Sequence, residues 1–219
     1  MSFALLVKDE MRGFYKSRVM IFLWFGLPLL TMLLRFWASL QGGEIPFTAL
    51  SAVITSSIGG TLSSVMLTVS IINERIQRVY DLFLVRPVKR WNIIVSKFLA
   101  VYACVAAASL LSLLLGLAID YVNMGGVSET VLNDTALSLV TSLSMMAVSS
   151  SAGVLIGVVA PSVLVGVILI IYGGNQISAL PMIPTILNIP NATVFTVTLG
   201  AVTTSVMLAL ATFLFNRKQ

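Results

Sequence analysis

The side chains that could do chemistry are few in this 219-residue chain. The sequence contains no histidine, so a Ser-His-Asp triad, a Cys-His pair and every histidine-ligated metal or haem site are excluded. Its one cysteine, Cys104, lies in apolar sequence, where a small buried hydrophobe is a better interpretation than a catalytic thiol. We therefore expect no catalytic residue, no metal site and no bound cofactor, and hence no enzyme.

Ionisable residues that remain are concentrated in clusters. All 13 lysines and arginines except Arg35 lie in residues 8–18, in residues 75–97 or at the end of the chain. The acids Asp120, Glu129 and Asp134 form a separate cluster that contains no basic residue. Because basic loops favour the cytoplasmic side of a membrane, this pattern gives an orientation if the chain is embedded in one.

The composition indicates a membrane protein. The chain is 58% hydrophobic and 10% charged, with a mean hydropathy of +1.03, whereas a soluble domain is about 45–50% apolar and about 25% charged. A bilayer core about 30 Å thick needs about 20 apolar residues as a helix. Six stretches meet this need, and Pro161 divides the fourth from the fifth. They are residues 19–40, 47–72, 98–119, 135–160, 162–180 and 193–215.

We therefore expect an all-α polytopic fold, with residues 1–219 forming a single transmembrane domain of six helices in the cell membrane. The N-terminus, residues 74–97 and the C-terminus are predicted to be cytoplasmic, with loops 41–46 and 120–134 outside. Within residues 1–18, an amphipathic helix over 3–18 is predicted to lie at the membrane surface. Its apolar arc contains Phe3, Leu6, Val7, Met11 and Phe14.

The segment 73–97 carries a second amphipathic pattern. Ile76, Val79, Tyr80, Phe83 and Leu84 recur at helical spacing, and the intervening positions are mostly charged. Pro87 ends the pattern, and about 12 residues at about 1.5 Å each are too few to cross a bilayer. Two interpretations stay open: an anchor for anionic lipid, or a docking surface for a soluble partner.

These residues resemble the cytoplasmic signature of the type-2, exporter-type permeases of ABC transporters. The sequence departs from it at Val79-Tyr80, where glycine-threonine is usual, and at Ser96, where glycine is usual. The matching positions are Glu74-Arg75, Leu82-Phe83-Leu84-Val85, Arg86-Pro87-Val88-Lys89-Arg90, Ile93-Ile94 and Lys97-Phe98-Leu99-Ala100.

The resemblance implies a permease subunit that pairs with a copy of itself or with a second permease. A separate ATP-binding-cassette subunit would bind and hydrolyse ATP, and its force would enter through the helix after the second span. None of the 15 glycines is followed by lysine, so this chain has no phosphate-binding P-loop of its own. Nucleic acid is not an expected partner. The residues implied in contact with the ATPase are Glu74, Arg75, Arg78, Tyr80, Asp81, Phe83, Arg86 and Pro87.

Two other functions compete with this expectation. A secondary transporter or channel driven by an ion gradient would need acids or histidines inside its spans, and the predicted spans carry none away from their ends. A membrane-embedded enzyme would need a catalytic set, which the sequence does not show. The transported substrate cannot be read from the sequence.

Small and polar residues inside the apolar segments give two further expectations. Gly153 and Gly157 have the spacing that lets two helices approach closely, within one chain or between two. Asn175 and Gln176 precede a proline-rich stretch, and irregular backbone at membrane depth needs protein or water beside it. Residues 172–190 are predicted to form either a partly re-entrant hairpin, with Asn175 and Gln176 as a gate at the outer mouth, or a simple extracellular loop.

Overall fold

The computed structural model describes residues 3–15, 17–41, 47–77, 90–124, 129–187 and 191–218, and within these ranges every regular element is a helix. The elements are α1 (Phe3–Tyr15), α2 (Arg18–Gln41), α3 (Phe47–Ile76), α5 (Arg90–Met124), α6 (Glu129–Val159), α7 (Val163–Leu169), the π-helical turn η1 (Ile170–Gly174), α8 (Asn175–Ser178), the 3₁₀ turn η2 (Leu180–Met182), α9 (Ile183–Ile186) and α10 (Ala192–Lys218).

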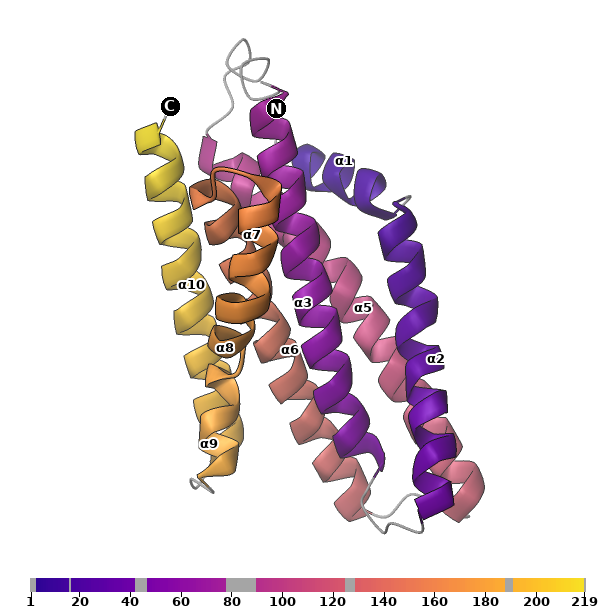
Figure 1. Ribbon diagram of the computed structural model, residues 1–219. Coiled ribbons are helices and arrows are strands. Elements are labelled where there is room, and N and C mark those ends of the chain that lie inside the picture. The colour runs from indigo at the N-terminus through magenta and orange to yellow at the C-terminus, as the bar shows by residue number, and fades with distance from the viewer. Residues whose placement is uncertain are drawn as a thin grey trace.

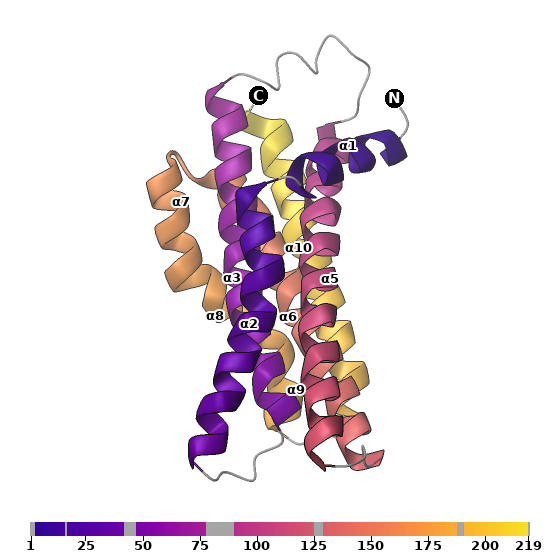
Figure 2. The same ribbon diagram turned by 90° about the vertical axis from the view of Figure 1, so that its right-hand side faces the viewer.

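The long helices run alternately up and down one bundle (Figures 1 and 2). Helix α1 lies across the upper end, α2 leads away from it, and α3 returns to it. Helices α5 and α6 repeat this course, followed by the downward run α7–α9 and the upward α10. Both ends of the chain therefore lie at the same, upper end of the bundle (Figure 2).

Five helices in the described part are long and apolar enough to cross a membrane: Thr55–Ile76, Trp91–Ile119, Thr135–Val159, Val163–Ile186 and Ala192–Arg217. They indicate an all-α, multi-pass membrane protein. The described part of α2 adds a shorter apolar stretch, Val19–Leu30. Several helix bounds differ from the sequence-based ones: α3 continues to Ile76, α5 begins at Arg90, α6 begins at Glu129 and the run α7–α9 ends at Ile186.

The segment after Pro161 is helical but irregular. Helix α6 ends at Val159, and Ser162 begins α7 by accepting a hydrogen bond from the Val165 backbone N–H at 3.4 Å. The π-helical and 3₁₀ turns then break the helix repeatedly between Ile170 and Met182. In the described residues this segment is a single helical run from the upper end to the lower end, not a hairpin (Figure 1).

Helices α3 and α6 pack closely because their facing residues are small. The Ser64 hydroxyl donates to the Ser149 carbonyl at 2.7 Å, and the Thr68 hydroxyl donates to the Gly153 carbonyl at 2.6 Å. A Cβ added to Gly153 would lie 2.6 Å from the Ser64 Cα atom. The expected glycine spacing thus serves contact within one chain, and Gly157 packs against Thr68 in the same way.

This contact predicts different results for two helical glycines. Gly153→Ala should lower the thermal unfolding midpoint in detergent, because its Cβ meets backbone that must shift, at a typical cost of about 1–3 kcal/mol. Gly173→Ala is the matched control, since no atom lies within 4 Å of its added Cβ. It should leave the midpoint unchanged or raise it, as alanine favours helix by about 1 kcal/mol. Equal midpoints for the two variants would contradict the close α3–α6 packing.

Candidate functional site

The segment predicted to receive a partner begins inside a long helix. Glu74 and Arg75 lie in the last turn of α3, which ends at Ile76, and the chain resumes with α5 at Arg90. The other residues predicted for this surface, namely Arg78, Tyr80, Asp81, Phe83, Arg86 and Pro87, lie outside the described residues. The described part of the site is therefore the pair of helix ends on either side of residues 78–89.

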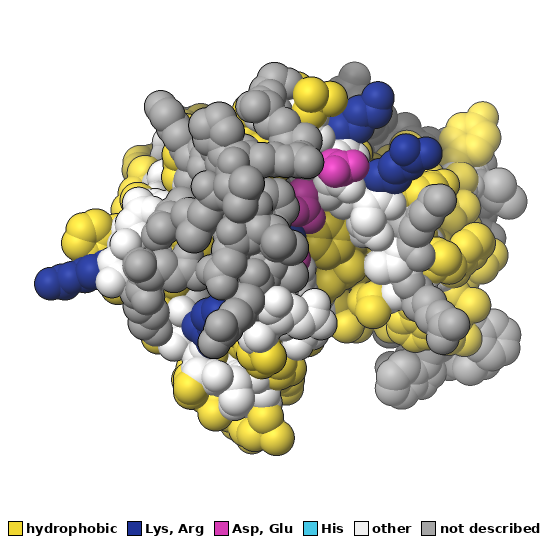
Figure 3. Space-filling view, turned by 90° about the horizontal axis from the view of Figure 1, so that it is seen from above, with side chains coloured by type: hydrophobic (Ala, Val, Ile, Leu, Met, Phe, Trp, Pro, Cys, Tyr) yellow, Lys and Arg dark blue, Asp and Glu magenta, His cyan; other side chains and the backbone are white. Residues whose placement is uncertain are grey.

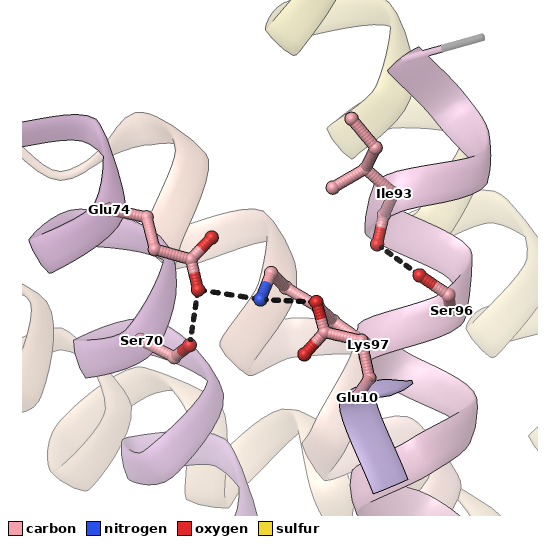
Figure 4. A network of polar contacts seen from close by, with 6 residues as sticks. All are labelled: Glu10, Ser70, Glu74, Ile93, Ser96 and Lys97. Atoms are coloured by element: carbon pink, nitrogen blue, oxygen red, sulfur yellow. Dashed lines mark hydrogen bonds and ion pairs between the residues drawn. The ribbon is translucent and has the colours of Figure 1, made fainter. Parts of the chain in front are cut away.

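Lys97 joins these helix ends to α1. Its Nζ atom lies 2.6 Å from Glu74 Oε1 on α3 and 2.8 Å from Glu10 Oε1 on α1 (Figure 4). The Ser70 hydroxyl donates to the same Glu74 oxygen at 3.1 Å. One ammonium group thus holds three helices that are separate in the sequence.

The position of Lys97 on α5 explains why its charge is buried. It shares a helix face with Ile93, Ile94, Ala100 and Val101, which are all buried in the core. Only 4% of the Lys97 side chain is exposed, against 23% for each of the two glutamates. A buried ammonium group needs charged or hydrogen-bonded partners, because desolvation is otherwise very costly. Here the two carboxylates supply them.

Apolar contacts hold α1 beside this ion pair. Leu6 and Phe14 are the buried residues of α1, one turn before and one turn after Glu10. The Lys97 Nζ atom lies 5.9 Å from the centre of the Phe14 ring, within the range of a cation–π contact. The same face of α1 therefore presents a carboxylate and an aromatic ring to one lysine.

The electrostatics of the three groups are unbalanced. One ammonium faces two carboxylates, so the cluster carries excess negative charge when all three are ionised. Burial raises the pKa of the Glu10 carboxyl above its usual range, the Lys97 ammonium opposes this rise, and the Glu74 carboxylate adds to it. Ionised Glu10 is therefore less favourable in the folded chain than in the unfolded chain.

Arg75 makes a second connection from the last turn of α3. Its guanidinium donates to the Val158 carbonyl at 3.1 Å and also to the Ala160 carbonyl. These carbonyls lie at the end of α6, where a helix has unpaired carbonyl groups and a partial negative charge. Glu74 thus bonds to α5, and Arg75 bonds to the turn between α6 and α7.

The residues predicted for an outer gate lie elsewhere. Asn175 is half-buried and Gln176 is exposed on α8, which lies roughly midway along the bundle rather than at its end (Figure 1). The structure does not bring them near Lys97. The buried Cys104 is a free thiol in the hydrophobic core.

Sequence reasoning missed the roles of Lys97 and Glu10. Lys97 was counted as one more residue of the basic cluster, and Glu10 was not singled out. A signal was present, because Glu10 follows Leu6 by four residues and precedes Phe14 by four, within the apolar arc of the helix. An acid on the apolar face of a surface helix indicates a buried cationic partner.

No protein-family model and no curated protein matches this chain. What the site can do therefore follows from its contacts. A shared, buried ammonium group can hold three helices together through its ion pairs. In the described residues no group of three or more His, Cys, Asp or Glu side chains is placed to hold a metal ion.

The raised pKa of Glu10 predicts how stability depends on pH. The extra stability from protonated Glu10 is present at low pH and is lost as the pH rises from the unfolded-state pKa, about 4.3, through the raised folded-state value. Glu10→Gln keeps an oxygen for Lys97 but cannot ionise. The unfolding midpoint of this variant, relative to wild type, should therefore increase as the pH rises above about 4.

Asp9→Asn, which changes an exposed acid on the same helix, is the matched control for that pH series. Thermal unfolding in detergent at several pH values measures all three proteins. A Glu10→Gln midpoint that stays parallel to wild type, or falls relative to it as the pH rises, would contradict the assignment.

Proposed function

We propose that this chain is the membrane-spanning permease subunit of an ATP-driven exporter in the cell membrane. In this proposal it spans the membrane six times, with α2 as the additional span, and both termini are cytoplasmic. It acts with a copy of itself or a second permease, and with a separate ATP-binding-cassette ATPase. The resemblance of residues 74–100 to type-2 permeases suggests this class.

The observation that carries the proposal is the bridge from Lys97 to Glu74. Residues 78–89 follow the end of α3, which contains Glu74, and precede the start of α5, which contains Lys97. The helices at the two ends of this segment are therefore joined by an ion pair. Force applied to this segment by a partner would reach α3 and α5 at once. Through Glu10 and Arg75 it would also reach α1 and the end of α6. A segment anchored in this way suits the transmission of force from an ATPase to the membrane-spanning helices.

One observation favours a second candidate, a transporter driven by a proton gradient. The Glu10–Lys97–Glu74 cluster has a buried ammonium group, two half-buried carboxylates and unbalanced charge, which are properties of a proton-binding site. The two candidates differ in their energy source. Transport by a proton-coupled protein would follow the pH gradient and would need no ATPase subunit.

We expect the tagged chain, purified in mild detergent from the organism that encodes it, to carry a P-loop protein in stoichiometric amount. The complex should hydrolyse ATP, and the chain alone should not. Phe83→Ala should weaken this association, because an aromatic anchor of an interface contributes about 2 kcal/mol, or roughly thirtyfold in affinity. Mass spectrometry and ATP hydrolysis measure the two effects.

Phe213→Ala is the control, since Phe213 is 61% exposed on α10 and is distant in sequence from the proposed surface. Charge reversal at Arg78 and Lys89 tests the alternative of a lipid anchor without disturbing the Arg75 contacts. Absence of any P-loop protein, or equal recovery of the ATPase with both phenylalanine variants, would overturn the proposal.

A further inference from the structure

A groove of about 580 Å³ opens beside the Lys97 cluster, between α1, the start of α2 and α3. Its α3 wall contains Leu62, Val65, Met66 and Val69, which follow the spacing of one helix face and are all half-buried. This apolar strip is about 10 Å long at a rise of about 1.5 Å per residue. Figure 3, seen from above, shows a hollow with hydrophobic walls and acidic side chains at its edge.

Glu10 gives the groove one charged corner. Its carboxylate lines the groove while one of its oxygens contacts Lys97. Phe14, one turn after Glu10 on α1, also lines the groove. Because two carboxylates share one ammonium group, a second cation at Glu10 would balance the cluster. The groove therefore combines an apolar wall with an acidic corner.

We propose that this groove binds a phospholipid with a primary ammonium head group, namely phosphatidylethanolamine. Its ammonium group donates hydrogen bonds to the Glu10 carboxylate, and one acyl chain lies along the strip from Leu62 to Val69. Binding at this site does not depend on ATP-driven export, because every group it uses lies in α1 and α3 of this chain.

The Glu10 carboxylate discriminates among lipid head groups. A trimethylated ammonium group has no N–H to donate, so phosphatidylcholine loses the charge-assisted hydrogen bonds that are the stronger class. A head group with net negative charge, as in phosphatidylglycerol, is repelled by the one excess negative charge that the two carboxylates and Lys97 leave. An apolar groove without the carboxylate would bind all three lipids equally.

The test is a thermal unfolding series on the full chain in detergent with each lipid added at equal concentration and with the same acyl chains. Phosphatidylethanolamine should raise the midpoint, since a ligand of the folded state stabilises it. Phosphatidylcholine and phosphatidylglycerol should each give less than about half of that rise. An equal or larger rise with either of them, or no rise with phosphatidylethanolamine, would overturn the proposal.

Two variants test whether the rise in the unfolding midpoint comes from lipid bound in this groove. Glu10→Gln keeps an acceptor for Lys97 and should lose at least about half of the rise with phosphatidylethanolamine, whereas Asp9→Asn should keep it. Val65→Phe keeps the carboxylate but fills the apolar strip, and it should also lose the rise. An undiminished rise with Glu10→Gln, or an equal loss with Asp9→Asn, would show that the lipid does not bind at this carboxylate.

Discussion

The buried ammonium group of Lys97 is the constraint on which the upper end of the bundle depends. A lysine that is 4% exposed must find its counter-charges inside the protein. It finds one on α3, the described helix that precedes α5, and one on α1, which is far from Lys97 in the sequence. The position of α1 across the bundle therefore follows from charge as much as from its apolar face, because Glu10 has to reach Lys97 (Figure 4).

The last turn of α3 is bonded to two neighbouring helices. Glu74 bonds to α5, and Arg75 bonds to the carbonyls that end α6. Below this turn, Ser64, Thr68 and Gly153 let α3 and α6 approach closely along the membrane-spanning part. A displacement of the α3 end would thus move α5, α6 and α1 together. This rigidity is what a membrane subunit needs if a soluble partner is to act on residues 78–89.

Local patterns in the sequence predicted much of this fold. The N-terminal helix, the break at Pro161 and the close packing at Gly153 follow from periodicity, proline sterics and glycine spacing, and the structure contains all three. The place of the N-terminal helix at a membrane surface stays a prediction. The Lys97 cluster was not predicted, because its three charged residues lie on three separate helices and Glu10 is distant from the other two in the sequence. The rule that assigns basic residues to cytoplasmic loops also gives no reason to expect a lysine whose side chain is buried between helices. The proposed partner surface from Arg78 to Pro87 lies outside the described residues and stays a prediction.

The most direct test of the account removes the ammonium group and then its counter-charges. Lys97→Met should lower the unfolding free energy by about 1–3 kcal/mol, because two half-buried carboxylates lose their partner. Adding Glu10→Gln and Glu74→Gln should recover much of this loss, and Lys8→Met, at an exposed lysine on α1, should cost little. If thermal unfolding in detergent gives Lys97→Met the same midpoint as Lys8→Met, or if the two neutralising substitutions restore nothing, Lys97 does not hold these helices together.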